Sequence, residues 1–245
     1  MRFSVIVLDR IDSTNAFARR QIEKSGALEG KVIWAREQYA GRGQGENSWH
    51  SGPGMNLTFS LLLEPIFLPP SRQFSLNKAI ALAVMNSVKQ TLPPDTTTLI
   101  KWPNDIYAGN RKIAGILIEH TIMGNSLIHS IVGIGINLNQ LEFPSDLPNP
   151  VSVKQITGLD HEPEKFLENV CLNIDREYSR LIRRAFTSIN DDYNSSLFGC
   201  GSELEFASGS SSFTGRLEGV DDLGRLLVMT TGGAIRIFTH GEIRF

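Results

Sequence analysis

Residues 111–138 read RKIAGILIEHTIMGNSLIHSIVGIGINL, two long apolar runs separated by the dipeptide Gly124-Asn125. Gly and Asn accept the backbone angles that a tight hairpin turn requires, and apolar runs rich in Ile and Val favour strands. We therefore expect strands at residues 112–121 and 126–138 that pair with each other antiparallel. The hairpin predicts a sheet that is not assembled from parallel strands with helical crossovers.

The segments on either side of this hairpin predict helices as well as further strands. A long helix is expected at about residues 72–92, because Leu, Ile and Val recur every four residues from Leu76 to Val88. Other helices are expected from the N-cap candidates at 12–15 to about Lys24, before Gly26, and at 164–186. Further strands are expected at residues 3–8, 31–36, 55–63 and 97–101. This pattern predicts an α+β fold whose sheet is mixed, mainly antiparallel, and flanked by helices.

The sequence changes character from Cys200 onward. Short segments typical of strands alternate there with Ser-, Asp- and Gly-rich turns, a spacing that favours a small β-barrel. A unit of that size buries little surface alone, so we expect it to dock on the larger part of the chain. We predict one domain at residues 1–198 and a small β-domain at residues 199–245.

Composition and charge exclude several classes of protein. The 245 residues are 41% hydrophobic and 20% charged, with a formal net charge of −2, values typical of a globular protein with a real core. The absence of a basic excess argues against sequence-independent nucleic-acid binding. No apolar run reaches the length of a membrane span, and no helix-turn-helix-sized segment precedes the first strand. Cys171 and Cys200 show no metal-ligand or disulfide spacing.

One long segment, residues 40–54, is rich in Gly, Asn and Ser and shows no periodicity. Loops of this length inside a compact domain are usually functional or disordered. The loop contains Gly41-Arg42-Gly43-Gln44-Gly45, in which glycines allow backbone N–H groups to approach an anion and Arg42 supplies a planar cation. The pattern lacks the Gly-Lys-Ser/Thr of a phosphate-binding P-loop. A flexible loop with one solvated arginine is the alternative interpretation.

Two lysines lie at strand ends where they could neutralise an anion. Lys101 begins Lys101-Trp102-Pro103-Asn104-Asp105, a segment that favours a tight turn, and Lys112 opens an apolar strand three residues before Gly115. Solvated surface lysines are the alternative for both. The glycines of Gly133-Ile134-Gly135 are explained equally well by sheet twist, helix packing or close approach of a ligand. No nucleophilic triad and no histidine ligand set is evident, so the pattern favours positioning and charge neutralisation over covalent catalysis.

Together and in this order, these segments resemble the biotin protein ligase family in its short form, without an N-terminal DNA-binding domain. The shared stretches begin with Asp12-Ser13-Thr14-Asn15 and continue through Gly41-Arg42-Gly43, residues 49–57, Lys101 to Asp105, Arg111 to Glu119 and Gly133 to Asn137. The resemblance implies a class II synthetase-like catalytic domain that binds biotin and ATP. It also implies that the small C-terminal β unit is an SH3-like barrel.

The resemblance also implies roles for individual residues. Lys112, Arg42, Lys101 and Asp105 would be catalytic, and the metal ligands stay unknown. Biotin would contact Ser13, Thr14, Asn15, Gln38, Arg42, Gly43, Gln44, Lys112, Gly115 and Ile116. ATP would contact Arg42, Trp49, Asn56, Lys101, Asn104, Asp105, Lys112 and Asn137.

The implied activity is an ATP-dependent ligation. Biotin and ATP would form biotinyl-5'-AMP, and biotin would then pass to a specific lysine of a biotin carboxyl carrier protein. ATP and Mg²⁺ would serve as co-substrate and activator and biotin as substrate, with no tightly bound cofactor. The resemblance implies a cytoplasmic protein with no DNA or membrane partner, and it leaves homodimerisation open. The alternatives are a lipoate–protein ligase and a non-catalytic biotin-binding protein.

The loop departs from a common family pattern at one position. Many members continue the GRG element with Arg, whereas this chain continues with Gln44-Gly45-Glu46. A glutamine cannot supply charge to a phosphate, and Glu46 adds the opposite charge. We therefore predict that this chain releases its adenylate more readily than a protein with arginine at position 44 would.

Overall fold

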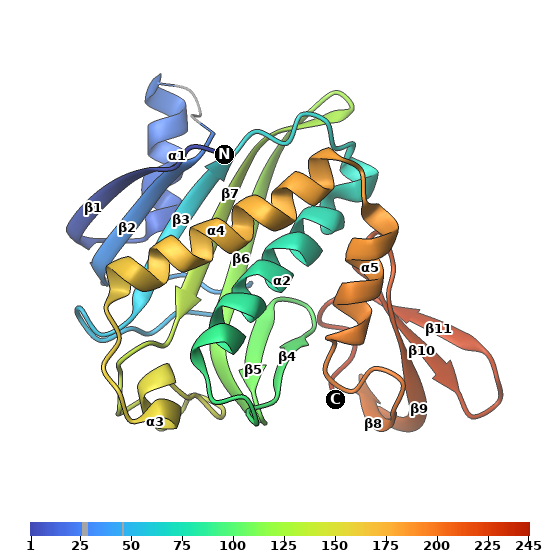
Figure 1. Ribbon diagram of the computed structural model, residues 1–245. Coiled ribbons are helices and arrows are strands. Elements are labelled where there is room, and N and C mark those ends of the chain that lie inside the picture. Colours follow the sequence, from blue (N-terminus) through green and yellow to red (C-terminus); the bar gives the residue numbers. More distant parts are fainter. Residues whose placement is uncertain (26–28, 46) are drawn as a thin grey trace.

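The computed structural model describes residues 1–25, 29–45 and 47–245, so the predicted helix stop at Gly26 and the charge of Glu46 lie outside the described residues. The described chain forms a seven-stranded sheet with helices on both faces and, beside it, a smaller four-stranded sheet (Figure 1). No helix in the described part of the chain combines the length and the apolar character needed to cross a membrane.

The larger sheet confirms the predicted α+β class. Its strand order is β1-β2-β3-β7-β6-β5-β4, and of these neighbours β1 and β2 pair parallel while the other pairs are antiparallel. The predicted hairpin is β6–β7, which pairs from Ala114 opposite Ile136 to Met123 opposite Ser126, with one shift of register between Thr121 and Ile122. The strands are β1 (Ser4–Ile11), β2 (Lys31–Gln38), β3 (Leu57–Leu63), β4 (Thr98–Lys101), β5 (Asp105–Ala108), β6 (Arg111–Met123) and β7 (Ser126–Ile136).

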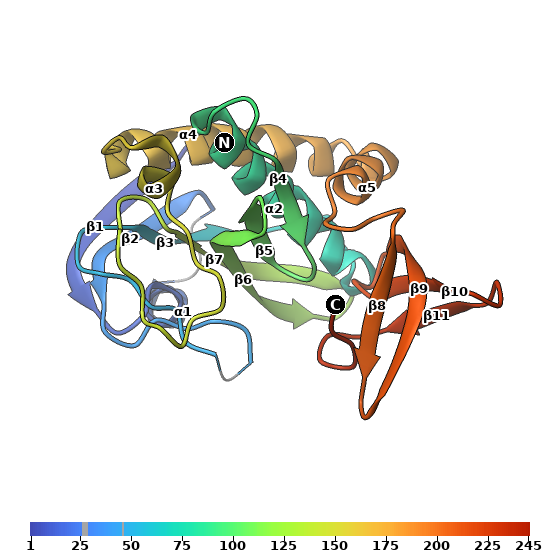
Figure 2. The ribbon, with the colours of Figure 1, turned by 90° about the horizontal axis from the view of Figure 1, so that it is seen from below.

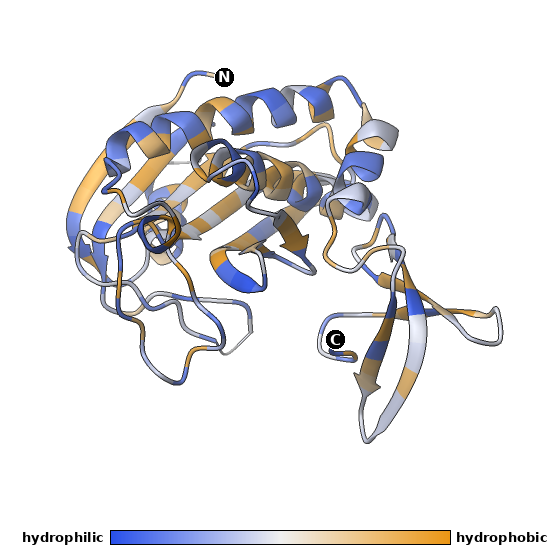
Figure 3. Cartoon of the chain, turned by 60° about the horizontal axis from the view of Figure 1, so that its bottom comes forward, coloured by the Kyte–Doolittle hydropathy of each residue, from blue (hydrophilic) through white to orange (hydrophobic). Residues whose placement is uncertain are grey.

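Helices cover both faces of this sheet, because its inner strands are apolar on both sides. Helices α2 and α4 lie on one face and α1 on the other (Figure 2). Leu61 of β3 belongs to the main core on the α2 side, whereas its neighbour Leu62 packs with Ala18 of α1. The strands are largely hydrophobic, and the helices alternate hydrophilic and hydrophobic residues (Figure 3). The helices are α1 (Thr14–Ser25), the 3₁₀ turn Pro70–Arg72, α2 (Gln73–Thr91), α3 (Val153–Thr157), α4 (Pro163–Ile182) and α5 (Phe186–Ser195).

Three elements differ from the sequence expectation. Strand β5 was not predicted, because it is four residues long and follows a Pro-Asn turn directly. Helix α3 was also missed, although Ser152 and Gln155 form a capping box at its start. The helix predicted to continue to Phe186 ends at Ile182, since Arg184 adopts a left-handed φ of 56° before α5 begins.

The C-terminal sheet curls toward a small barrel. Its order is β11-β10-β9-β8, and an isolated bridge between Ala207 and Arg244 links the segment after β11 to the free edge of β8. Residues 242–245 contribute this bridge and no further strand. Phe206 lies at the centre, 5.6 Å from the ring of Phe213 and 5.5 Å from that of Phe245. The strands are β8 (Glu203–Ser208), β9 (Ser211–Val220), β10 (Leu226–Thr230) and β11 (Ile235–Phe238).

The turn between β9 and β10 is inserted into the larger body. Lys78 of α2 is buried and donates hydrogen bonds to the carbonyl of Val220 (2.7 Å) and to Oδ1 of Asn190 in α5 (2.6 Å). Burial lowers the pKa of Lys78 to about 8. On the other side of the turn, Trp102 Nε1 donates to the carbonyl of Gly224 at 2.9 Å. The Lys101–Asp105 turn is therefore anchored to the C-terminal sheet.

Candidate functional site

A cavity of about 800 Å³ lies where the strands β5, β6 and β7 meet the loop at residues 40–54 and the C-terminal segment. It has two chemically different ends. We call the surroundings of Ser13, Thr14, Asn15 and Gln38 the amide end, and those of Lys101, Asp105 and Lys112 the lysine end. The cavity is lined by these seven residues and by the predicted Arg42, Gly43, Gln44, Trp49, Asn104, Gly115, Ile116 and Asn137.

The amide end is a network of neutral groups at the N-terminus of α1, buried except for the half-buried Gln38. Gln38 Oε1 accepts from the backbone N–H of Thr14 at 2.7 Å and from its hydroxyl at 3.1 Å. Ser60 of β3 completes the network, with its Oγ 2.7 Å from Thr14 Oγ1 and 2.6 Å from Asn15 Oδ1. Each of these side chains is held by another, so the donors and acceptors that face the cavity are fixed in direction. Such a wall can recognise a small polar ring.

One carboxylate links this network to the loop. Glu119 of β6 accepts from Asn15 Nδ2 at 3.0 Å and from Arg19 Nη2 at 2.6 Å, and its Oε1 lies 3.6 Å from Arg42 Nη1. Neither Ser60 nor Glu119 was predicted as a site residue. No local signal marks them, because their partners lie far away in the chain.

The strand glycines at the centre of the cavity leave room for two side chains. A Cβ placed on Gly133 would lie 2.3 Å from Asn15 Oδ1, and one on Gly135 would lie 2.3 Å from Cε2 of the Trp49 indole. Gly115 approaches the same indole, at 3.1 Å from Cζ3. Close approach of other groups thus explains these glycines, an alternative that the sequence left open.

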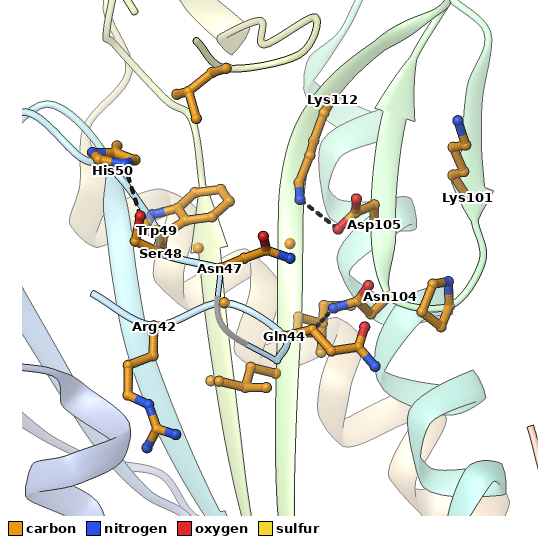
Figure 4. A pocket seen from close by; sticks show the side chains of 18 of the residues that line it. Arg42, Gln44, Asn47, Ser48, Trp49, His50, Lys101, Asn104, Asp105 and Lys112 are labelled. Atoms are coloured by element: carbon orange, nitrogen blue, oxygen red, sulfur yellow. Dashed lines mark hydrogen bonds and ion pairs between the residues drawn. The ribbon is translucent and has the colours of Figure 1, made fainter. Parts of the chain in front are cut away.

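The lysine end is built on the short strand β5 and the turn before it. Lys112 Nζ lies 2.7 Å from Asp105 Oδ1, and the two side chains point toward each other across the cavity (Figure 4). Asn104 is fixed to β6 twice: its Nδ2 donates to the carbonyl of Ile116 at 2.7 Å, and its own carbonyl accepts from the Ile116 N–H at 2.9 Å. The turn therefore holds Asp105 rigidly beside Lys112.

Lys101 is held by aromatic rings. Its Nζ lies 5.2 Å from the ring centroid of Tyr107, 5.6 Å from that of Phe198 and 5.7 Å from that of Phe245. No ion pair joins Lys101 to a carboxylate in the part of the chain that the structure describes. Ring faces attract a cation without neutralising it, so Lys101 keeps its charge available for an anion in the cavity.

The loop crosses the cavity between the two ends. Arg42 points away from Lys112, whereas Gln44 lies near Asn104 and Asn47 points toward the centre (Figure 4). Gln44 Oε1 and Trp49 Nε1 are buried and have no hydrogen-bond partner among the described residues. Buried polar atoms in a cavity wall are candidates for bonds to a ligand. Arg42, which was predicted to contact both biotin and ATP, lines the cavity with its guanidinium next to Glu119.

Asn56 does not line the cavity. Its Nδ2 donates to Gln140 Oε1 at 2.5 Å and to Ser51 Oγ at 3.2 Å, and its Oδ1 accepts from the Leu138 N–H at 2.9 Å. The side chain is thereby fully used inside the chain, where it connects the loop to the end of β7. Asn137 does reach the cavity, while its Nδ2 donates to the carbonyl of Val151 at 3.1 Å.

Two further segments line the cavity that the sequence analysis did not include. The first is the connection from Phe143 to Pro150, which is tied to β6 by the backbone bond from Lys112 N–H to the Asn149 carbonyl at 2.8 Å. The second is the C-terminal segment, which contributes His240, Arg244 and Phe245. Both are far from the motifs in sequence and carry no local pattern that points to a ligand.

The arrangement suits ligands that carry negative charge at one end and a polar ring at the other. The lining cations are Arg42, Lys101, Lys112 and Arg244, and the lining carboxylates among the described residues are Asp105 and Asp146. Ser48 Oγ lies 2.9 Å from His50 Nε2, but both residues are exposed and no described carboxylate orients the imidazole. The geometry therefore favours the positioning of two reactants over formation of a covalent enzyme intermediate.

Comparison with known proteins gives matches over nearly the whole chain. Residues 7–137 match the model of the biotin/lipoate A/B protein ligase family, and residues 199–245 match that of the biotin protein ligase C-terminal domain. The biotin–[acetyl-CoA-carboxylase] ligase of Paracoccus denitrificans is 32% identical, with 98% of this chain and 99% of that protein covered. The bifunctional ligase/repressor BirA of Bacillus subtilis is 31% identical, with 96% of this chain and 72% of that protein covered.

A solved structure shows the same likeness in three dimensions. The biotin protein ligase from Aquifex aeolicus in complex with biotin and ATP superposes with a TM-score of 0.80 at 28% identity, and the match covers 98% of this chain and 97% of that chain. The likeness includes both sheets, since it extends over nearly the full length of each protein.

Proposed function

The chain belongs to the biotin/lipoate A/B protein ligase family, and from this premise we propose that it is a biotin–protein ligase. It forms biotinyl-5'-AMP from biotin and ATP and transfers biotin to a lysine of a biotin carboxyl carrier protein. The first family model includes lipoate ligases as well as biotin ligases. The observation that decides between them is the match of residues 199–245 to a domain of biotin protein ligases.

We assign the amide end to the biotin ring and the lysine end to the phosphates. The network of Thr14, Asn15, Gln38 and Ser60 presents fixed polar groups of the kind that a ureido ring pairs with. Lys101 and Lys112 present positive charge at the other end of the same cavity. A ligand with a polar ring, an aliphatic chain and a carboxylate spans this distribution in one orientation.

The first half-reaction joins two anions. An oxygen of the biotin carboxylate attacks the α-phosphorus of ATP, and the bond to pyrophosphate breaks as the new O–P bond forms. Lys112, positioned by Asp105 at 2.7 Å, reduces the repulsion between the two anions, and Lys101 adds a second charge. Cations fixed in place before the reaction stabilise the charge of the transition state without reorganisation.

Mg²⁺ is expected to enter with the nucleotide. Among the described residues no group of three or more His, Cys, Asp or Glu side chains could hold a metal ion by itself. This fits Mg²⁺, which prefers one or two carboxylates together with phosphate oxygens and water; Asp105 and Asp146 are the lining carboxylates in the described chain. When bound, Mg²⁺ would neutralise charge on the phosphates.

The second half-reaction needs no enzyme nucleophile. The neutral amine of the acceptor lysine attacks the carbonyl carbon of the mixed anhydride, the C–N bond forms, and the C–O bond to AMP breaks. The amine loses one proton, and Asp105 is our candidate to accept it because its carboxylate faces the reacting end of the cavity. A cytoplasmic location and homodimerisation stay predictions from the family resemblance.

Pyrophosphate exchange into ATP tests the proposal. With purified protein, ATP and Mg²⁺, exchange should depend on biotin and should not be supported by lipoate. Exchange with lipoate instead would identify a lipoate–protein ligase. Binding of biotin without any exchange would identify a non-catalytic biotin-binding protein.

A further inference from the structure

We infer that Glu119 is a positioning residue for this reaction, because one carboxylate fixes both the amide end and the loop that crosses the cavity. The inference rests on the proposed function. Glu119 does not line the cavity itself. It acts through Asn15 and Arg42, which do line it.

The geometry places three donors around this carboxylate. Its Oε2 accepts from Asn15 Nδ2 at 3.0 Å, while its Oε1 accepts from Arg19 Nη2 at 2.6 Å and lies 3.6 Å from Arg42 Nη1. The Glu119 side chain is 23% exposed, so the carboxylate is partly shielded from water. Its charge is balanced by one arginine from α1 and one from the loop.

For Asn15, the carboxylate decides which way the amide faces. The nitrogen side is occupied by Glu119 and by the carbonyl of Leu117, at 3.4 Å, so Oδ1 is directed to Ser60 at 2.6 Å. Asn15 is 3% exposed, and its Oδ1 lies directly beside Gly133. The Asn15 amide cannot flip in this confined position without losing both hydrogen bonds that its nitrogen donates. Glu119 therefore sets the pattern of donors and acceptors that the ligand meets.

For the loop, the carboxylate provides an anchor on the sheet. The loop closes on itself through the bonds from Gly43 N–H to the Asn47 carbonyl (2.8 Å) and from Trp49 N–H to the Gly41 carbonyl (3.0 Å). Within the described loop residues 41–49, Arg42 makes the one ion pair to the body of the protein. The ion pair holds Arg42 on the sheet and thus keeps Gln44 and Trp49 over the cavity.

The substitution Glu119→Gln tests the charge while it keeps the shape. A glutamine can still offer an oxygen to Asn15, but it attracts neither arginine. Because Arg42 is about half exposed, water screens its ion pair with Glu119. We therefore expect loss of this pair to change the rate of adenylate release about five-fold rather than by orders of magnitude. Release of biotinyl-5'-AMP should be about five-fold faster, and KM for biotin should rise in proportion.

Two further variants separate this role from a purely structural one. Arg19→Gln removes the other arginine of the same carboxylate and leaves the loop anchor, so adenylate release should stay at the parental rate. Arg42→Gln should speed release as Glu119→Gln does, and the two together should be no faster than either alone. If Glu119→Gln does not fold, Glu119→Asp carries the test: it keeps the charge but moves it one methylene away from Arg42, so adenylate release should again be faster than in the parent.

The outcomes distinguish failure of the proposed function from failure of the inference about Glu119. A parent protein that forms no biotinyl-5'-AMP removes the proposed function and this inference with it. An active parent whose Glu119→Gln variant keeps the parental release rate and KM for biotin removes the inference alone. Equal effects of Arg19→Gln and Glu119→Gln on adenylate release would also overturn the inference. They would show that the Glu119 carboxylate acts by holding α1 and not by holding the loop.

Discussion

The two ends of the cavity are built in different ways. The amide end consists of neutral groups that satisfy one another within one sheet and one helix, from Thr14 to Ser60. The lysine end depends on contacts between the middle and the C-terminal part of the chain: Lys101 lies over the ring of Phe245, and Trp102 donates to the Gly224 carbonyl. Recognition of a neutral ring and handling of phosphates should therefore respond to different substitutions.

The largest effect is expected at the lysine end, from Lys112→Ala. The variant lacks the cation beside the reacting anions and leaves Asp105 without its partner, so adenylation should fall about 10²–10³-fold. Lys154→Ala is the matched control, since Lys154 pairs with Asp160 at 2.6 Å outside the cavity and should keep parental activity. Parental exchange rates in a folded Lys112→Ala protein would remove Lys112 from the mechanism.

At the amide end, Gly133→Ala should disturb biotin binding selectively. The added Cβ would lie 2.3 Å from Asn15 Oδ1, and Asn15 has no room to retreat. The Asn15 amide must therefore shift from the position in which it faces the ligand, so KM for biotin should rise about ten-fold while KM for ATP stays constant. Gly232→Ala, whose nearest neighbour would be Thr230 Oγ1 at 3.9 Å, serves as control. An equal rise in both constants would contradict the separation of the two ends.

The anchor between the two sheets can be tested with Trp102→Phe. The variant keeps a ring but loses the hydrogen bond to Gly224, a loss of about 1 kcal/mol. KM for ATP should rise about five-fold, with KM for biotin unchanged. Trp34→Phe is the control, because Trp34 Nε1 is buried without a hydrogen-bond partner among the described residues. If Trp102→Phe affects stability but neither constant, the anchor does not position the turn.

A smaller effect is expected from Gln44→Arg. Gln44 lies near Asn104 at the lysine end (Figure 4), so an arginine there would add charge next to the phosphate and slow adenylate release several-fold. Gln44→Met changes the side chain without adding charge and should not slow release. An unchanged rate for Gln44→Arg would show that position 44 does not control retention.

The junction of the two sheets also predicts a pH dependence of stability. Because burial lowers the pKa of Lys78 from 10.5 to about 8, the unfolded chain binds a proton in this range that the folded chain lacks. Stability should therefore rise with pH between about 8 and 10.5. Urea unfolding of the parent and of Lys78→Met should show a free-energy difference that moves in the parent's favour across this window. A free-energy difference that does not change with pH across this window would contradict the lowered pKa of Lys78.

Features that depend on residues close together in the chain could be predicted from the sequence. The β6–β7 hairpin follows from the apolar runs around Gly124-Asn125, and the family motifs located most of the cavity lining. Three residues of the site were not predicted: Ser60, Glu119 and Phe245. Each contacts a site residue at least 45 positions away in the chain, as Ser60 contacts Asn15. The ion pair of Arg42 with Glu119 was not predicted for the same reason, since Glu119 lies on a strand far from Arg42 in the sequence.

The central claim is that one cavity holds a carboxylate and a nucleotide together until they join. Mass spectrometry of the purified protein incubated with biotin, ATP and Mg²⁺ measures this directly. The account predicts biotinyl-5'-AMP bound to the protein, formed in the parent and greatly reduced in Lys112→Ala. A folded parent protein that binds both substrates and forms no acyl adenylate would contradict it.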